Sequence, residues 1–258
     1  MSHNNQKKIA VINDFCGFGR CSLSVSIPVI SALKVQCCPL PTSVFSNHTG
    51  FDSFFYTDYT AYMRDYFEEW RRLDLSFDGI LTGFLASPEQ IAIVREFLHF
   101  FRREKTVTVI DPVMGDYGKL YPTYSPELAS KMSELLAYAE ILTPNLTEAC
   151  LLTKTPYRND FSAKELEQIC RDLARRGPSK IVITGLEDGE DLENFVYEED
   201  REPILVRSHR VGPNRSGTGD VFSSILAADA VNGIGFADSV FIPVRNDIAY
   251  PELAKDLC

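Results

Sequence analysis

The sequence predicts an α/β fold in which a mostly parallel central sheet is covered by helices on both faces. Short runs rich in β-branched residues alternate with runs of helical apolar spacing along most of the chain, which is typical of parallel α/β proteins. Hydrophobic residues make up 45% of the 258 residues and charged residues 24%, as in an ordinary globular domain. Polar or glycine-containing loops follow several of the predicted strands. In such a sheet these loops would gather at one edge.

The predicted strands are short apolar runs that end in turn residues. In chain order they cover residues 7–13, 36–40, 77–82, 106–110, 140–143 and 180–184, followed by a small hairpin at 195–197 and 203–206. Asp14 is expected in the turn that ends the first strand.

The predicted helices have apolar residues at helical spacing and recognisable end signals. They cover residues 22–33, 57–73, 88 to the basic cluster at 102–105, 125–137, 146–152, 162–176 and 217–231. Ser87 followed by Pro88 predicts an N-cap and a first helical position, and Ser162 with Glu165 predicts a capping box. The aromatic stripe at 59–70 is expected to be core or a dimer face.

The chain is expected to form a single domain, 1–258, because it shows no internal repeat, linker or low-complexity tract. Its net charge of −10 disfavours a nucleic-acid-binding face, since such faces are basic. No apolar run reaches the length of about 18 residues that a membrane span needs. The N-terminus lacks an apolar signal-peptide region, and the seven cysteines are scattered. We therefore expect reduced thiols and a cytoplasmic protein.

The first candidate site is the tetrapeptide of residues 217–220, Gly-Thr-Gly-Asp, at the start of the last predicted helix. Glycines allow a ligand to approach the backbone closely, and the free amides of a helix N-terminus favour a negative charge there. The alternative is a simple helix cap, in which Thr218 or Asp220 satisfies the free amides.

Two further motifs directly follow predicted strands. Asp111 and Asp116 are carboxylates five residues apart on one loop, which suits a divalent cation or polyphosphate chemistry, although a plain turn is the alternative. Thr143-Pro-Asn-Leu-Thr-Glu148 also follows a strand, and its alternative is an Asn145 cap with Glu148 at the third helical position. Thr184 lies at the end of the Val-Ile-Thr-Gly strand, where a plain strand-to-turn transition is the alternative and, for this motif alone, the favoured one.

The N-terminal region contains two more candidates. Asn13-Asp14 and the Gly-Phe-Gly-Arg run at 17–20 imitate a dinucleotide fingerprint, but Ser22 stands where its third glycine belongs. The polar loop at 42–50 contains His48, which is either functional or an ordinary loop histidine. The chain has no P-loop, and its cysteines lack zinc spacing.

Because the ends of parallel strands meet at one edge, these loops would surround one crevice. The side chains that they would bring together are Asp14, His48, Asp111, Asp116, Glu148, Thr184 and Asp220. Carboxylates for a metal, an anion-binding helix start and a further aspartate predict a kinase without a P-loop.

The ordered motifs resemble the ribokinase-like superfamily and, within it, the pyridoxal kinase family. GTGDVF resembles the anion-hole motif of the superfamily, and DPVMGD, TPNLTEA and VITG resemble its nucleotide and metal motifs. PLPTSVFSNHTGF resembles the pyridoxal kinase substrate loop, and NDFCGFGRCSLSVSIPVISAL resembles a bacterial branch labelled pyridoxamine kinase. The resemblance implies a ribokinase-like three-layer sandwich. It also implies ATP-dependent phosphorylation of the 5′-hydroxymethyl group of a vitamin B6 vitamer: pyridoxal, pyridoxamine or pyridoxine.

The resemblance also implies a role for each matching residue. Asp220 would be the catalytic base, and the amides of Gly217, Thr218 and Gly219 would steady the transferring phosphoryl group. The residues expected to contact the vitamer are Asp14, Thr42, Ser43 and His48. Those expected at ATP are Asp111, Asn145, Glu148 and Thr184. Those expected at Mg²⁺ are Asp111, Asp116 and Glu148, with Thr143 near a monovalent cation such as K⁺. A homodimer is implied as well.

Two departures from the family pattern leave questions open. Many pyridoxal kinases have serine where Asp14 stands, and a carboxylate there could pair with a protonated pyridine nitrogen or with the pyridoxamine amine. The chain after about Gly233 is short for the family, and residues 241–250 look like a contraction of the wall around adenine.

Two alternatives to a B6-vitamer kinase follow. One is hydroxymethylpyrimidine kinase, which has the same fold but usually carries GTGC at the helix start. Asp220 therefore favours the prediction of a B6-vitamer kinase. The other is a catalytically weak protein that binds a B6 vitamer or a nucleotide, which the contraction near the C-terminus would favour.

Overall fold

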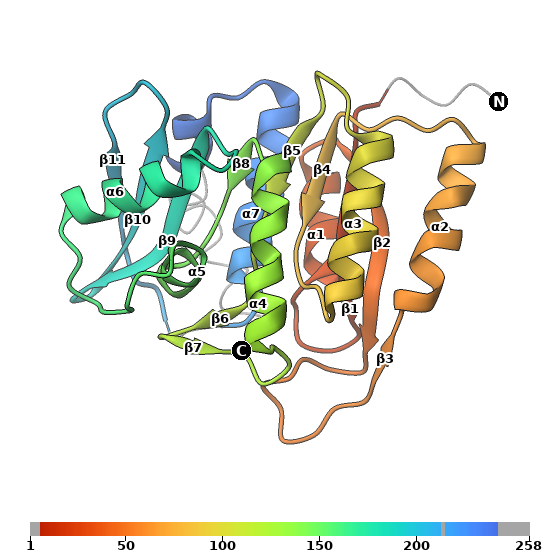
Figure 1. Cartoon of the computed structure of the whole chain (residues 1–258), viewed down its shortest axis with the longest axis horizontal. Helices are drawn as coiled ribbons and strands as arrows, with labels where there is room; N and C mark the ends of the chain where they lie inside the picture. The colour runs from red at the N-terminus through yellow and green to blue at the C-terminus, as the bar shows by residue number, and fades with distance from the viewer. Residues whose placement is uncertain (1–5, 213–214, 242–258) are drawn as a thin grey trace.

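The computed structural model describes residues 6–212 and 215–241 and arranges them in three layers (Figure 1). A nine-stranded sheet forms the middle layer, with the strand order β11-β10-β9-β8-β5-β4-β1-β2-β3. A separate two-stranded ribbon, β6–β7, lies near the lower edge of the sheet in Figure 1. The predicted α/β sandwich with helices on both faces is confirmed.

The centre of the sheet is parallel, and its edges are antiparallel. The parallel strands, in spatial order, are β9 (Lys180–Asp188), β8 (Ile141–Leu142), β5 (Val107–Ile110), β4 (Gly79–Thr82), β1 (Lys8–Cys16) and β2 (Gln36–Phe45). The antiparallel edge strands are β3 (Tyr56–Asp58), β10 (Asp191–Glu198) and β11 (Ile204–His209). The ribbon consists of β6 (Gly115–Asp116) and β7 (Lys119–Leu120).

Helices cover both faces of the sheet and enclose a separate apolar core on each. One face carries α1 (Leu23–Ala32) and α7 (Thr218–Asn232), which pack on each other. The other face carries α2 (Thr60–Arg72), α3 (Pro88–Phe101), α4 (Pro126–Met132), a 3₁₀ turn (Ser133–Tyr138), α5 (Leu146–Thr153) and α6 (Ala163–Ala174). This doubly covered arrangement explains why the parallel strands are almost continuously apolar.

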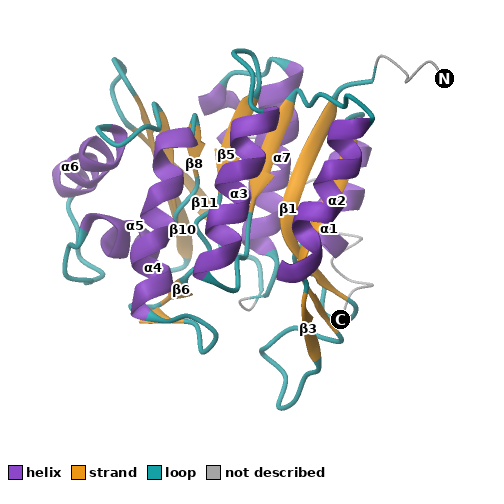
Figure 2. Ribbon diagram, turned by 45° about the vertical axis from the view of Figure 1, so that its right-hand side comes forward, coloured by secondary structure: helices purple, strands orange, loops and turns teal. Residues whose placement is uncertain are grey.

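The direction of the chain reverses across the sheet at β1. The chain passes from β1 to β2 on one side and then returns to β4 on the other side of β1. Ligands of open α/β sheets bind beyond the carboxyl ends of strands at such a switch point. In Figure 2 these strand ends face downward, and β3 with its preceding loop extends beyond them.

The structure corrects two boundaries near this point. Asp14 does not lie in a turn, because β1 continues through it to Cys16. The pairing of β1 with β2 is irregular between Asn13 and Phe15 and then resumes with Phe15 opposite Val44. Strand β2 is also longer than predicted, since residues 43–45 pair with β3, which the sequence did not predict.

The predicted helix caps are confirmed. The Ser87 side chain accepts a hydrogen bond from the Gln90 N–H at 3.2 Å, with Pro88 in the first turn. Asn145 and Ser162 begin α5 and α6 with capping boxes. The Asn145 cap fixes where α5 begins and therefore where Glu148, in its first turn, is placed.

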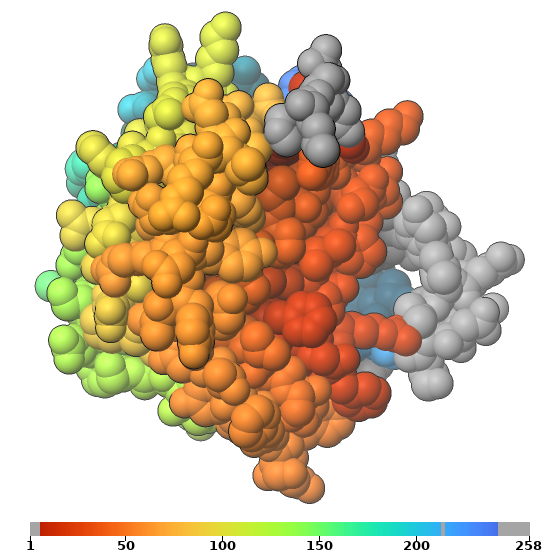
Figure 3. Space-filling model, turned by 90° about the vertical axis from the view of Figure 1, so that its right-hand side faces the viewer, coloured from red at the N-terminus to blue at the C-terminus, as the bar shows by residue number. Residues whose placement is uncertain are grey.

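The aromatic stripe of α2 is mostly core. Met63 and Phe67 are fully buried, and Tyr66 and Trp70 pack against the same core, whereas Tyr62 is 56% exposed. Figure 3 looks onto the outer side of β3 and α2, drawn in orange.

No helix among residues 6–212 and 215–241 is long and apolar enough to cross a membrane. Apart from Phe241, the predicted contraction at 241–250 lies outside the described residues.

Replacing Phe97 by alanine tests the core beneath α3. Phe97 is fully buried between Phe67 and Phe101, so Phe97→Ala should lower the free energy of unfolding by about 3–5 kcal/mol. The matched control is Phe100→Ala on the same helix, where the ring is 36% exposed and a loss of about 1 kcal/mol or less is expected. Urea unfolding measures both, and equal losses would contradict this packing.

Candidate active site

The N-terminus of α7 sits directly on the loop that follows β1. Gly217 has φ 86°, and a Cβ atom on it would lie 2.1 Å from the carbonyl oxygen of Arg20. A side chain is therefore excluded both by the left-handed backbone and by this close approach. Gly219 differs, because its φ is not in the left-handed region and a Cβ there would meet no atom of residues 6–212 or 215–241 within 4 Å. As far as these residues are concerned, the space in front of Gly219 is open to a ligand.

The Asp220 carboxylate is held by two N–H groups of the β1 region. Its Oδ1 accepts a hydrogen bond from Asn13 Nδ2 at 2.9 Å, and its Oδ2 accepts one from the backbone N–H of Ser22 at 2.8 Å. Burial nevertheless raises the pKa of Asp220 above its ordinary value, and these two bonds only partly offset the rise. Asp220 therefore connects the start of α7 to β1 and to the loop that follows it, at the switch point of the sheet.

The loop that receives Asp220 has an unusual backbone. Arg20 has φ 48° and Ser22 has φ 58°, both in the left-handed region although neither is glycine. Such residues cost on the order of 1–3 kcal/mol each and concentrate at functional sites. Here the conformation directs the Ser22 N–H to Asp220 and the Arg20 carbonyl to Gly217.

Asp14 lies beside Asp220 at the end of β1. It is only 7% exposed, and its burial together with the nearby charge of Asp220 raises its pKa to about 7, against the lowering effect of the Ser22 hydroxyl. The two aspartates, which the sequence placed in different motifs, are therefore electrostatic neighbours.

The backbone ladder extends one residue past the ends of β5 and β8 and thereby positions the next two polar groups. The Asp111 N–H donates to the Thr82 carbonyl at 3.1 Å, and the Thr143 N–H donates to the Ile110 carbonyl at 3.1 Å. Burial and the charge of Asp220 raise the pKa of Asp111 to about 8, while the hydroxyls of Ser223 and Thr143 lower it. The predicted grouping of Asp111 with Asp220 is thus present in the structure.

Glu148 is buried and braces the loop after β5. Its Oε2 accepts the Asn145 N–H at 2.8 Å, and its Oε1 accepts the Met114 N–H at 3.0 Å. Asn145 accepts the Glu148 N–H in return and donates from Nδ2 to the Gly115 carbonyl. Burial, and then the charge of Asp111, raise the pKa of Glu148 well above its ordinary value. The capping-box alternative is therefore correct as local structure, and the same carboxylate still lies near Asp111.

Asp116 and Thr184 lie in other elements, β6 and β9, and no described interaction joins either of them to Asp220. Asp116 is exposed on β6, where its Oδ1 accepts the Tyr117 N–H at 2.8 Å, and its pKa is raised by burial and by the nearby charge of Glu187. Thr184 lies within β9, and its N–H donates to the Pro144 carbonyl at 2.9 Å, so it is adjacent to Asn145.

Apart from Asp14 in β1, the residues predicted to contact the vitamer come from β2 and its following loop. Thr42 and Ser43 are fully buried, and the Thr42 hydroxyl donates to the Phe84 carbonyl at 2.9 Å. The His48 ring is wedged between Gly19 and Gly50, where a Cβ atom on Gly19 would approach it to 2.1 Å. Its Nδ1 accepts the Gly50 N–H, so the ring joins the loops after β1 and β2. No described interaction joins His48 to Asp14 or Asp220.

Three residues of this region have a place in the structure that the sequence did not predict. Asn13 and Ser22 hold Asp220, whereas the sequence had singled them out only as parts of an incomplete dinucleotide fingerprint. Tyr121 lies near four carboxylates, whose charges raise its pKa further after burial has raised it. Nothing in the local pattern around Tyr121 signals this, because the ribbon that places it was not predicted.

Four inner carboxylates, Asp14, Asp111, Glu148 and Asp220, lie at this edge of the sheet. Within the described part of the chain, no lysine, arginine or histidine forms an ion pair with any of them. Buried carboxylates without counter-ions are unfavourable, so a bound cation would stabilise this edge of the sheet. Hard oxygen donors of this kind suit Mg²⁺.

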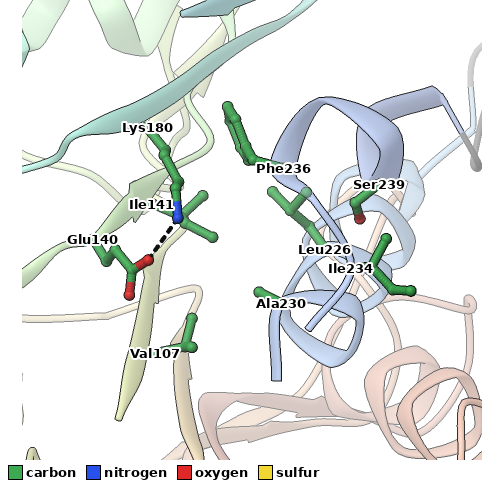
Figure 4. A pocket seen from close by; sticks show the side chains of 9 residues that line it. All are labelled: Val107, Glu140, Ile141, Lys180, Leu226, Ala230, Ile234, Phe236 and Ser239. Carbon is green, nitrogen blue, oxygen red and sulfur yellow. Dashed lines mark hydrogen bonds and ion pairs between the residues drawn. The ribbon is translucent and has the colours of Figure 1, made fainter. Parts of the chain in front are cut away.

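A small cavity lies at the opposite ends of the strands, where β5, β8 and β9 begin. Val107, Ile141 and Lys180 open β5, β8 and β9, and they face Phe236 and α7 across a space of about 60 Å³ (Figure 4). The Lys180–Glu140 ion pair, at 2.8 Å, closes one side of it. This cavity is separate from the carboxylate cluster.

The fold, the glycine turn of α7 and the carboxylates at the strand ends define a kinase fold of the ribokinase-like class. The chain belongs to the phosphomethylpyrimidine kinase family, which matches residues 26–242. It is 31% identical over 198 residues to pyridoxal kinase of Arabidopsis thaliana, a match that covers 73% of this chain and 62% of that protein. The predicted relationship to pyridoxal kinases is confirmed.

Two similar solved structures are described as a putative phosphomethylpyrimidine kinase from Bacteroides thetaiotaomicron. The first is 35% identical with a TM-score of 0.91 and covers 97% of this chain and 90% of that one. The second, a form with pyridoxal, is 36% identical with a TM-score of 0.90 and covers 93% and 86%.

Replacing each of the two glycines before Asp220 by alanine should change the free energy of unfolding by different amounts. Gly217→Ala places a side chain on a left-handed backbone and against the Arg20 carbonyl, so it should destabilise the protein by about 2 kcal/mol or more. Gly219→Ala, in open space in the first turn of α7, should change stability by about 1 kcal/mol or less. Thermal unfolding compares them, and a larger loss for Gly219→Ala would contradict the packing of α7 on the β1 loop.

The stability of the ligand-free protein should depend on Asp14. Because the pKa of Asp14 is higher in the folded state (about 7) than in the unfolded chain (3.8), its proton stabilises the fold, and this stability is lost as pH rises from about 4 to 7. Each tenfold change in proton affinity is worth about 1.4 kcal/mol. Asp14→Asn should therefore unfold at a higher temperature than the parent at pH 8, with the difference smaller at pH 5 and absent near pH 4.

The control for this comparison is Asp65→Asn, an exposed aspartate of α2. It should leave the pH profile of the unfolding temperature unchanged. A gap for Asp14→Asn that is the same at both pH values would show that Asp14 is not a strained buried carboxylate.

Proposed function

We propose that the protein is an ATP-dependent kinase that phosphorylates the 5′-hydroxymethyl group of a vitamin B6 vitamer. The observation that carries this proposal is the Asp220 carboxylate, fixed at the first turn of α7 beside open space at Gly219 and beside the switch point of the sheet. The relationship to a pyridoxal kinase and to a structure with pyridoxal supports the same activity. The match spans less than two thirds of the Arabidopsis protein, and the activity of this chain therefore stands as a proposal.

In the proposed reaction Asp220 is the base. The hydroxyl oxygen of the vitamer forms a bond to the γ-phosphorus of ATP while the bond from that phosphorus to the β–γ bridging oxygen breaks. The hydroxyl proton passes to the Asp220 carboxylate, and ADP leaves. The raised pKa of Asp220 makes it a stronger proton acceptor than an exposed aspartate, which suits general-base catalysis near neutral pH.

The backbone amides of residues 217–219 would bind the oxygens of the transferring phosphoryl group. They belong to the free N–H groups of a helix start, whose dipole also favours negative charge. Fixed donors of this kind stabilise the charge that spreads over the phosphoryl oxygens in the transition state. Gly219, which lacks a side chain and faces open space, would let that group reach the amides.

The described residues contain no group of three or more His, Cys, Asp or Glu side chains that could hold a metal ion by itself, so Mg²⁺ would bind between fewer carboxylates and the phosphates of ATP. Asp111 and Glu148 would hold it, in part through water because both Glu148 oxygens already accept backbone N–H bonds. Asp116 and Thr143 are further candidates, Thr143 toward a monovalent cation. The ion would supply charge neutralisation for the phosphates of ATP. Asn145 and Thr184, which lie side by side, would contact those phosphates.

The acceptor would lie at the ends of β1 and β2, against Asp14, Thr42, Ser43 and His48. Asp14 could pair with a protonated pyridine nitrogen or with the amine of pyridoxamine, and the preferred vitamer stays open. The homodimer, the cytoplasmic location and the single-domain organisation stay predictions as well.

Hydroxymethylpyrimidine kinase is the second candidate function, because the matching family and the Bacteroides structures carry that type of name. ADP release should be followed with Mg-ATP and each acceptor in turn: pyridoxal, pyridoxamine, pyridoxine and 4-amino-5-hydroxymethyl-2-methylpyrimidine. Turnover of B6 vitamers is the expected result. Turnover of the pyrimidine alone would overturn the B6 proposal, and binding without turnover would identify a carrier.

Replacing Asp220 by asparagine tests the base. Asp220→Asn should lower kcat by about 10²–10⁴-fold, because the proton acceptor is lost, and should leave ATP affinity nearly unchanged. The matched control is Asp229→Asn on the same helix, where the carboxylate bonds Ser239 and should not affect kcat. Steady-state kinetics and nucleotide titration measure both, and an unchanged kcat for Asp220→Asn would reduce Asp220 to a helix cap.

A further inference from the structure

Asn13 lies buried at the end of β1, where its amide makes three hydrogen bonds. Its Oδ1 accepts the N–H groups of Asp14 at 3.0 Å and of Phe84 at 2.8 Å, and its Nδ2 donates to Asp220 Oδ1 at 2.9 Å. The side chain is 4% exposed. One amide therefore joins three segments: β1, the loop after β4, and the start of α7.

These partners allow only one orientation of the amide. If its oxygen and nitrogen were exchanged, the oxygen would face the Asp220 carboxylate and the NH₂ group would face two N–H donors. The two acceptor bonds to rigid backbone thus determine that the NH₂ group points at Asp220. The Asn13 amide, which the backbone of the sheet holds in place, therefore orients the Asp220 carboxylate.

Gly83 makes room for this amide. A Cβ atom on Gly83 would lie 2.5 Å from both Cγ and Nδ2 of Asn13, although the φ of Gly83 is not in the left-handed region. The φ of Gly83 does not require glycine, and the three atoms nearest to such a Cβ all belong to the Asn13 side chain. The Gly83 N–H continues the sheet by donating to the Ile12 carbonyl at 2.8 Å.

We propose that Asn13, seated on Gly83, is a positioning residue that holds the carboxylate of Asp220 in the orientation needed to accept the substrate proton. This rests on the proposed role of Asp220 as base. Asn13 does not take part in the proton transfer. A small displacement of a reacting group can cost about 10²-fold in rate, so loss of this support should appear in kcat rather than in ATP binding.

A double-mutant cycle tests the pair. Asn13→Ala should lower kcat at least about tenfold while the KM for ATP changes less than about threefold. Gly83→Ala should also lower kcat, because the new methyl group displaces the amide. In the combined variant the methyl group enters space that the amide has left, so kcat should be no lower than in Asn13→Ala alone. The matched control is Asn232→Ala, whose amide bonds the Leu33 carbonyl at the far end of α7 and should leave kcat unchanged.

Gly83→Ala keeps the asparagine and its charge environment, so it tests the inference even where Asn13→Ala does not fold. Folded variants that keep kcat within about threefold of the parent would overturn the positioning role, as would losses that multiply in the combined variant. If Asp220→Asn abolishes turnover and Asn13→Ala does not, this inference fails and the proposed function stands. If the parent phosphorylates no acceptor, both fail.

Discussion

The site depends on the close contact between the start of α7 and the loop after β1. Gly217 fits against the Arg20 carbonyl only because it has no side chain, and this contact brings Asp220 to the Ser22 N–H. The last described long helix is thereby fixed to the first strand of the sheet. Because β1 is the switch point, the helix N-terminus opens onto the edge where the other strand ends converge.

The same edge concentrates negative charge that no basic residue among 6–212 and 215–241 neutralises. Asp14, Asp111 and Glu148 are buried near one another or near Asp220, and burial raises the pKa of each. A protein with a net charge of −10 can still accept an anionic nucleotide here. Helix amides would bind phosphate oxygens, and a cation on the carboxylates would offset the remaining charge.

Much of the fold could be predicted from the sequence because its signals are local. The apolar runs of β4 and β5, the Ser87–Pro88 start of α3 and the Asn145 cap all depend on neighbouring residues. The ends of β1 and β2 could not be predicted, since β1 continues past Asp14 through the pairing of Phe15 and Cys16 with β2, and Ser43 pairs with Asp58 of β3. Propensity alone assigns such polar residues to turns.

The same distinction holds at the site. The motifs identified Asp220, Asp111 and Glu148, and the parallel topology correctly predicted that Asp111 lies near Asp220. The support for Asp220 was invisible, because the hydrogen bond from Asn13 spans 207 positions and the contact of Asn13 with Gly83 depends on the packing of β1 beside β4. Neither residue type carries a local signal for such a role.

The most direct test of the central claim is a crystal structure with Mg²⁺, a non-hydrolysable ATP analogue and pyridoxamine. We expect the 5′-oxygen of the vitamer within hydrogen-bond distance of the Asp220 carboxylate, and the γ-phosphate hydrogen-bonded to the amides of residues 217–219. A vitamer whose hydroxyl points away from Asp220, or a nucleotide bound at another edge of the sheet, would contradict it.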